Sequence, residues 1–148
     1  MELIFDLLLP RDRLTVPMVR HLFRSSLAEL GVASECIEEL ELAITEACSN
    51  ALKHARPGED QYEVAARVDG ALAEVTVTNL GIPGLGSEAE PALDAESGRG
   101  VLLMSHLVDR FSFEEHEDST SVKLSKKLTL MEDSVLAKLP PLHAASGR

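Results

Sequence analysis

The segment 34–55 carries acidic, amide and basic side chains at spacings that place them on one side of a helix. At about 100° per residue, Glu39, Glu46, Asn50 and Lys53 fall within about 40° of one another, and His54 lies at the edge of this group. A carboxylate, an amide oxygen and an ammonium in one line can serve as a base, a metal ligand and a phosphate contact. Taken alone, the same residues also fit the solvated outer face of an ordinary amphipathic helix. The opposite, apolar face is formed by Ile37, Leu40, Ile44, Ala47, Ala51 and Ala55.

Two glycine-rich stretches follow downstream and can supply a second half of such a site. Residues 75–84 form a strand pattern that ends abruptly in glycines, and residues 97–104 place Gly98 and Gly100 directly before a helical pattern. Glycine lets backbone amides approach an anion closely, and a helix N-terminus adds partial positive charge. Either stretch alone fits an ordinary turn or cap, but the two together, after the polar helix, indicate a phosphate site.

Composition limits the classes of protein to which this chain can belong. At 148 residues with 45% hydrophobic content, it has the size and apolar content of one domain. The formal net charge of −11 disfavours nucleic acid and anionic lipid as partners. Cys36 and Cys48 are about 18 Å apart in one helix, which is too far for a disulfide. Without a signal peptide or membrane span, we expect a cytoplasmic protein.

The order of predicted elements favours an α+β two-layer sandwich, with helices on one face of a mixed, mostly antiparallel sheet. The first helix contains the periodic residues Leu14, Met18, Leu22, Leu27 and Leu30, and the second begins with Ser34 as its N-cap. We expect strands at 1–9, 62–68, 72–78, 111–117 and 120–128, helices at 14–30, 34–55 and 101–108, and a long loop at 79–100. Asp69 and Gly70 form the turn of the central hairpin. We expect one domain at 1–130 and a partly disordered tail at 131–148.

These motifs, from Leu3 to Leu128, resemble the GHKL superfamily of ATPases and kinases, and specifically its anti-sigma factor serine kinases. Glu46 and Asn50, in the run Glu-Ala-Cys-Ser-Asn-Ala-Leu-Lys-His-Ala, resemble the N-box of that family. The resemblance implies that Glu46 is the general base, that Asn50 binds Mg²⁺, and that Lys53 or His54 lies beside the phosphates of ATP.

The same resemblance extends to the glycine-rich run before the third helix and to a late strand. The run Ser97, Gly98, Arg99, Gly100, Val101 and Leu102 is similar to the second glycine box, which covers the triphosphate. Thr120 is similar to the threonine that closes the site on a late strand. The implied cofactors are ATP and Mg²⁺.

One box departs from the family pattern, which has Asp followed by two glycines at alternate positions. Here these positions hold Asn79, Gly81 and Pro83, and Gly84 is displaced by one. The family Asp accepts a hydrogen bond from the adenine amino group. An Asn oxygen can accept the same bond, but it is neutral, so the bond is weaker. Proline also stiffens a hinge that is normally glycine.

The resemblance implies a protein-serine kinase that binds a sigma factor and phosphorylates an anti-sigma factor antagonist, and it leaves open a homodimer. The departures at Asn79 and Pro83 instead favour a binding module with weak or no catalysis, acting as a stoichiometric regulator. A fragment of a sensor histidine kinase is less favoured, because no phosphoacceptor helix pair or membrane span precedes the domain.

Overall fold

The computed structural model describes residues 1–81, 102–116 and 119–139. The elements follow in the order β1 (Glu2–Pro10), α1 (Thr15–Glu29), α2 (Ser34–Lys53), β2 (Gln61–Asp69), β3 (Leu72–Leu80), a short helix at 102–107, β4 (Arg110–Glu115), β5 (Ser119–Lys127) and α4 (Val135–Lys138). The predicted elements are therefore present, with ends that differ by a few residues. No helix in the described ranges has the length and apolar character needed to cross a membrane.

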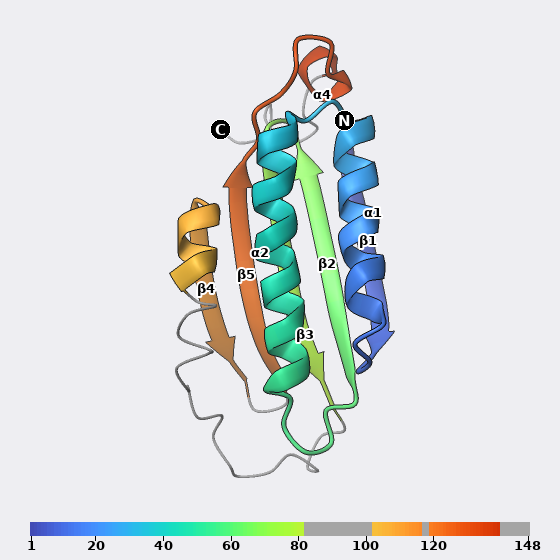
Figure 1. Cartoon of the computed structure of the whole chain (residues 1–148), viewed down its shortest axis with the longest axis vertical. Helices are drawn as coiled ribbons and strands as arrows, with labels where there is room; N and C mark the ends of the chain where they lie inside the picture. Colours follow the sequence, from blue (N-terminus) through green and yellow to red (C-terminus); the bar gives the residue numbers. More distant parts are fainter. Residues whose placement is uncertain (82–101, 117–118, 140–148) are drawn as a thin grey trace.

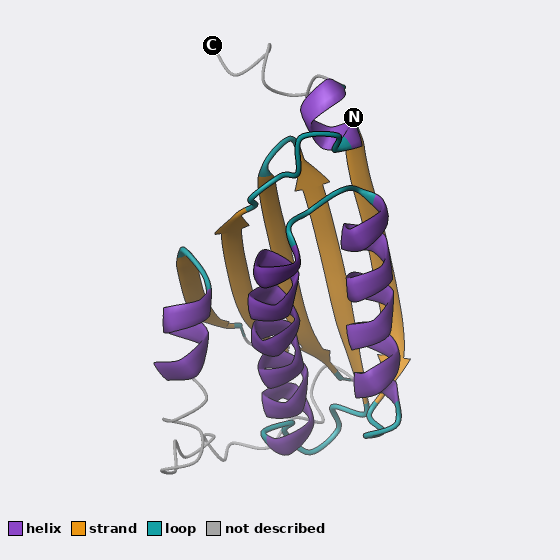
Figure 2. Ribbon diagram, turned by 45° about the horizontal axis from the view of Figure 1, so that its top comes forward, coloured by secondary structure: helices purple, strands orange, loops and turns teal. Residues whose placement is uncertain are grey.

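One five-stranded sheet has the strand order β1-β2-β3-β5-β4. Every described neighbouring pair is antiparallel, and the central hairpin pairs Asp69 with Leu72, so Gly70 and Ala71 form its turn. Gly70 has a φ of 58°, a left-handed conformation that glycine adopts readily. α1, α2 and the short helix at 102–107 lie on the same face of this sheet (Figures 1 and 2). The expected α+β two-layer fold is confirmed, and its described sheet is antiparallel throughout.

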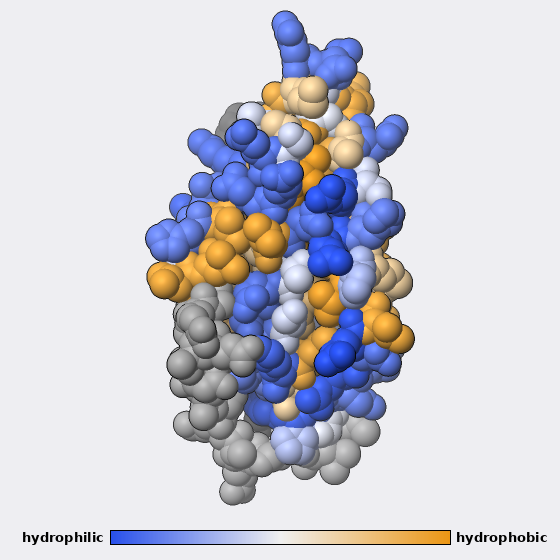
Figure 3. All heavy atoms as spheres, in the orientation of Figure 1, coloured by the Kyte–Doolittle hydropathy of each residue, from blue (hydrophilic) through white to orange (hydrophobic). Residues whose placement is uncertain are grey.

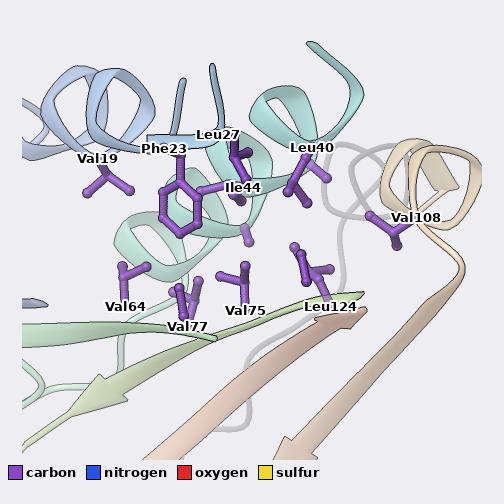
Figure 4. Packing of buried hydrophobic residues seen from close by; sticks show 14 of the residues in the cluster. Val19, Phe23, Leu27, Leu40, Ile44, Val64, Val75, Val77, Val108 and Leu124 are labelled. Atoms are coloured by element: carbon purple, nitrogen blue, oxygen red, sulfur yellow. The ribbon is translucent and has the colours of Figure 1, made fainter. Parts of the chain in front are cut away.

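The core lies between the helices and one face of the sheet (Figure 4). Alternate residues of β2 and β3 are buried, as expected for a sheet with only one covered face. The ring of Phe23 on α1 meets that of Phe5 on β1 edge to face, with centroids 4.8 Å apart. α1 therefore packs over the β1 side of the sheet.

The first helix is present, but only Leu27 and Leu30 of its predicted periodic residues are buried. Leu14, Met18 and Leu22 are exposed, whereas the buried residues of α1 are Thr15, Val19, Phe23 and Leu27. The helix carries two apolar stripes, and only the one that contains the bulky Phe23 packs on the sheet.

The start of α2 also corrects a prediction. Ala33, not Ser34, is the N-cap residue, and no side chain caps this end. Ala33 is extended because it continues a β-bridge between Val32 and Leu130, and its N–H donates to the Thr129 carbonyl at 2.8 Å. Contacts with Thr129 and Leu130, near the C-terminal end of the chain, therefore fix where α2 begins.

Residues 131–139, in the segment expected to be a partly disordered tail, pack against the turn between α1 and α2. The Ser134 hydroxyl donates to the Leu30 carbonyl at 2.6 Å, and Leu136 is buried. Gly31, with a φ of 82°, lies so close that an added Cβ would be 2.6 Å from the Ser134 Cα. Residues 140–148 lie outside the described part of the chain.

Candidate functional site

The polar stripe of α2 borders the core on the side away from α1. On the α1 side, the Glu41 carboxylate pairs with the Arg24 guanidinium at 2.7 Å. On the other side, the Glu39 carboxylate lies 3.8 Å from the Lys126 ammonium on β5. Glu46 and Asn50 follow Glu39 by two and three turns, so they lie on this second side.

Lys126 ties β5 to the short helix at 102–107. Its ammonium donates to the Leu107 carbonyl at 2.7 Å, and the residue is buried. A buried ammonium is stable only when it is hydrogen-bonded or paired, and Leu107 and Glu39 supply these contacts. The polar stripe of α2 therefore faces the side of the sheet that carries β5 and the short helix.

The predicted residues of the stripe differ in exposure. Asn50 is only 6% exposed, Glu39 and Glu46 are half-buried, and Lys53 is exposed. His54 is half-buried at the C-cap, where its N–H donates to the Asn50 carbonyl at 2.9 Å. The interpretation of the whole stripe as a solvated outer face is therefore wrong for Asn50, because the buried arc of the helix extends to that residue.

A row of polar side chains crosses the sheet at one end. Tyr62, Asn79 and Thr120 are direct cross-strand partners on β2, β3 and β5. They share the alternation of the buried residues Val64, Val77 and Val122, so they point toward the helices. Asn79 is 5% exposed, which places its carboxamide inside the fold.

Tyr62 is a member of this row that the sequence prediction missed. Its hydroxyl shares a hydrogen bond with the Thr15 hydroxyl at the start of α1. Burial raises the pKa of Tyr62, so it stays a neutral phenol. Tyr62 is the one tyrosine of the chain and belongs to no recognisable motif. Only the register between β2 and β3 places it beside Asn79.

The loop between α2 and β2 packs against the end of β3. A Cβ added at Gly81 would lie 2.8 Å from the Gly58 carbonyl oxygen and 3.0 Å from Glu59 Cγ. Glu59 is buried, and its carboxylate accepts from the Arg56 backbone N–H at 2.6 Å and from the Arg56 guanidinium at 3.3 Å. Gly81 is therefore required for the close approach of these two segments.

The sequence prediction also missed the ion pair between Arg56 and Glu59. The Arg56 guanidinium also donates to the His116 carbonyl at 3.4 Å, so it joins this loop to the end of β4. The available signal was a pair of opposite charges three residues apart around Pro57 and Gly58. Such pairs are common at surfaces, and only the burial of Glu59 distinguishes this one.

The predicted residues that the structure describes belong to segments that lie at one end of the molecule. The C-terminal end of α2, the end of β3 and the start of β5 lie together at the lower end of the sheet in Figure 1. The described residues Glu46, Asn50, Asn79, Gly81 and Thr120 belong to these segments, and Leu102 begins the described part of the short helix, where it is exposed. Gly84, Gly98, Arg99, Gly100 and Val101 lie outside the described residues, so the distance from Asn50 to the second glycine box stays a prediction.

The chemistry of the described residues suits a polar ligand and a hard cation. Carboxamide oxygens, such as those of Asn50 and Asn79, can accept hydrogen bonds or bind Mg²⁺. Glu46, one turn before Asn50, can accept a proton. The described residues contain no cluster of three or more His, Cys, Asp or Glu side chains that could hold a metal by themselves. A cation here would need oxygens from a ligand, as Mg²⁺ commonly does with phosphates.

Known structures share this fold. A structure of the RsbU and RsbW domains of Rv1364c from Mycobacterium tuberculosis superposes with a TM-score of 0.67 at 21% identity, covering 85% of this chain and 32% of that chain. The chain therefore spans about a third of that protein's structure. The SiaB–SiaC complex from Pseudomonas aeruginosa gives a TM-score of 0.58 at 18% identity, covering 83% of this chain and 88% of that chain. No curated protein sequence matches the chain.

A family model provides the assignment that these distant structural similarities do not. The model of the histidine kinase-like ATPase domain matches residues 9–126, which include α2, the polar row and the loop that contacts Gly81. The match covers most of the chain, including the C-terminal part of α2 and the polar row of the sheet. The chain therefore belongs to the family of histidine kinase-like ATPase domains.

Proposed function

We propose that the chain binds Mg²⁺–ATP at the polar end of its sheet and acts as a protein-serine kinase in a partner-switching system. The supporting observation is the position of two buried carboxamides, Asn50 and Asn79, in segments that end together beside Gly81. Buried amides need polar partners, and a nucleotide with its cation supplies them. The match to a family of ATPase domains gives the same ligand class.

Each side chain has a role in this proposal. Asn79 accepts a hydrogen bond from the adenine amino group, with Thr120 beside it in the row. Asn50 holds the magnesium ion, which when bound neutralises charge on the phosphate oxygens. Lys53 or His54 lies beside the phosphates, and the segment Gly98, Arg99, Gly100, Val101 and Leu102 covers them. Glu46 accepts the proton of an incoming serine hydroxyl.

Glu46 suits the base role because of its position on α2. It is half-buried one turn before Asn50, on the side that faces β5 and the short helix. A carboxylate one helical turn away from a metal ligand can reach a hydroxyl that attacks the bound phosphate. Most of the rate enhancement in phosphoryl transfer comes from positioning and electrostatics, and the base contributes a smaller factor.

The partners in this proposal are a sigma factor, which the domain sequesters, and an anti-sigma factor antagonist, which it phosphorylates, both in the cytoplasm. Both structural neighbours share the fold and come from structures that hold a further domain or protein. One contains an RsbW domain in the same structure as an RsbU domain, and the other is solved as a complex of SiaB with SiaC. At such low sequence identity, the similarity is evidence for the fold only. The protein partners therefore need an experimental test of their own.

Calorimetric titration with a non-hydrolysable Mg²⁺–ATP analogue tests the ligand. We expect binding that Asn50→Ala abolishes, because this substitution removes the metal ligand. Ser49→Ala, at the adjacent half-buried position, is the control and keeps wild-type affinity. Both variants are first compared by chemical unfolding, so that a loss of fold is not mistaken for a loss of ligand. Absence of binding by the folded wild-type protein would contradict the proposal.

Transfer of labelled γ-phosphate to an anti-sigma factor antagonist tests the reaction. Glu46→Gln keeps the shape of the side chain and removes the base, so nucleotide binding is retained and transfer falls by about 10²-fold or more. Transfer at the wild-type rate in this variant would remove Glu46 from the mechanism.

The residue at position 79 favours a second candidate function. A neutral Asn stands where the family pattern has Asp, and its burial means that solvent does not compensate for the weaker bond. A stoichiometric regulator with weak or no catalysis would result. Asn79→Asp distinguishes the two, because it tightens nucleotide binding by about tenfold if the neutral bond limits affinity. A wild-type protein that binds its protein partner equally with and without nucleotide would favour the regulator.

A further inference from the structure

Lys126 is a charged residue in an otherwise apolar row of the sheet. It pairs with Ala73 on β3, which pairs with Val68 on β2, and both of these partners are buried. On β5 the alternate residues Val122 and Leu124 are buried as well, so Lys126 points into the layer between the sheet and the helices. Its side chain is only 11% exposed. Apolar packing therefore does not account for a lysine at this position.

The Lys126 ammonium has partners on two different helices. It donates to the Leu107 carbonyl, at the C-terminal end of the short helix at 102–107, over 2.7 Å. The Glu39 carboxylate of α2 lies 3.8 Å from the same ammonium. We call these three residues the Lys126 clamp. The clamp joins α2 to the short helix through one side chain of β5.

The clamp contributes more to geometry than to stability. Replacing a buried ion pair by apolar side chains of similar volume is often neutral or stabilising, because the charges lose their hydration. Glu39 is also half exposed, so solvent weakens its attraction to Lys126. A hydrogen bond nevertheless fixes direction and distance, whereas apolar burial is non-directional. The effect of Lys126 is therefore expected in the placement of the helix that it holds.

The short helix is packed on the core by its later residues. Met104 and Val108, one turn apart, are buried, whereas Leu102 and Leu103 at its start are 59% and 42% exposed. Figure 3 shows apolar side chains exposed over this helix, at the left margin of the molecule. Apolar contacts at one end leave a two-turn helix free to rotate or tilt. The bond from Lys126 to its last carbonyl restricts both motions.

Both helices extend from the clamp toward the polar end of the sheet. Along α2, Glu46 and Asn50 follow Glu39 by about 10 Å and about 16 Å. The short helix runs antiparallel to α2, so its first residue, Leu102, lies on the side of the polar end (Figures 1 and 2). The glycine run at 98–101 directly precedes Leu102 in the chain. The angle between the two helices at the clamp therefore sets where the glycine run enters the site.

We propose that Lys126 is a positioning residue, which holds the short helix in one placement against α2 and so sets the spacing between the two halves of the nucleotide site. This inference rests on the proposed function, because the spacing matters for binding only if both halves contact one nucleotide. Lys126 does not itself touch the ligand. Six residues of β5 separate it from Thr120 in the polar row, which is about 20 Å.

Pulsed electron–electron double resonance on the whole chain tests the placement of the short helix. Nitroxide labels are attached at Leu42→Cys on α2 and at Leu102→Cys on the short helix, where both leucines are more than half exposed. Cys36 and Cys48 are buried, so the labels react at the introduced thiols. We expect a narrow distance distribution in the wild-type background and a broader or shifted distribution with Lys126→Met.

Two controls isolate the clamp. Lys127→Met removes the neighbouring, exposed lysine and should leave the distance distribution unchanged. A second pair of labels, at Leu42→Cys and Met18→Cys, reports the distance between α2 and α1, which Lys126→Met should not alter. A distribution between positions 42 and 102 that is the same with Lys126→Met as in the wild-type background would overturn the proposal. This measurement needs no nucleotide, so it is independent of the proposed kinase activity.

Calorimetric titration connects the clamp to the nucleotide. If the short helix is correctly placed in about a tenth of Lys126→Met molecules, affinity for the Mg²⁺–ATP analogue falls about tenfold. Methionine has a similar length and no charge, so the unfolding midpoint should stay the same or rise. Leu136→Ala removes a buried side chain near the turn between α1 and α2, so it should lower the midpoint and keep the affinity.

The two measurements together distinguish the possible failures. Wild-type affinity in Lys126→Met, despite an altered distance distribution, would overturn the positioning role. If the wild-type protein does not bind the analogue, the proposed function fails, and the distance measurement still decides whether Lys126 positions the short helix.

Discussion

Replacing Gly81 by alanine tests whether the loop before β2 and the end of β3 form one rigid unit. The added Cβ would lie 2.8 Å from the Gly58 carbonyl oxygen, a distance that real Cβ atoms do not show, and 3.0 Å from Glu59 Cγ. Neither neighbour can move freely. Gly58 has a φ of 90°, and the Glu59 carboxylate is held by Arg56. The loop must therefore shift as a whole.

The expected cost follows from this overpacking. Forcing an extra methyl group into a packed site costs about 1–3 kcal/mol. For a domain of this size, each kcal/mol lowers Tm by about 2–4 °C, so we expect a decrease of about 2–12 °C. The shifted loop also adjoins the polar end of the sheet. Affinity for the Mg²⁺–ATP analogue should therefore fall as well, by more than the loss of folded protein explains.

Gly70→Ala is the matched control for this prediction. Gly70 has a φ of 58° in the β2–β3 turn, at the opposite end of these strands from Gly81, so alanine there costs about 1–2 kcal/mol of backbone strain. Chemical unfolding and calorimetry are measured for both variants. We expect both to lose stability and only Gly81→Ala to lose nucleotide affinity. An unchanged unfolding midpoint for Gly81→Ala, or equal affinity in the two variants, would refute the reasoning.

Three further predictions concern single buried or partly buried groups. Asn79→Val replaces a buried carboxamide by an apolar group, so Tm should stay the same or rise while calorimetry shows lost nucleotide binding; a lower Tm would contradict this. Burial and the neighbouring Asp6 carboxyl raise the pKa of Glu63, so ionised Glu63 destabilises the fold as pH rises through that pKa. Glu63→Gln should therefore raise Tm at neutral pH and lose this gain under acidic conditions, whereas Glu74→Gln on the same sheet face should not. Burial raises the pKa of Cys48 to about 12, so in a Cys36→Ser background its thiol should react with Ellman's reagent only along the unfolding transition.

Sequence periodicity predicted the helices and strands well because each repeats over several turns or alternations. It could not decide which of two apolar stripes on α1 faces the core. Leu14 and Met18 fit the helical period as well as Val19 and Phe23 do, and only the ring contact between Phe23 and Phe5 distinguishes them. That contact joins residues from separate elements, which a local pattern does not contain.

The sequence also indicated part of the candidate site. A motif in one segment identified Asn50 and Glu46, and the strand that ends in glycines identified Asn79 and Gly81. Glu59 was missed, because its importance comes from burial against the end of a different strand. The helix projection also misjudged Asn50, since angles around an axis do not show how far the sheet extends beneath the helix.

The rows across the sheet change from apolar to polar at the end where we propose that the ligand binds. Val64, Val77 and Val122 form one apolar row, and the next row toward the end of β3 contains Asn79 and Thr120 in equivalent positions. A valine at position 79 would extend the apolar core by another row, and burying an amide is less favourable than burying an apolar side chain. A fold optimised for stability alone would therefore continue the apolar pattern. A change from an apolar row to a polar row is expected where a fold gives up stability for binding.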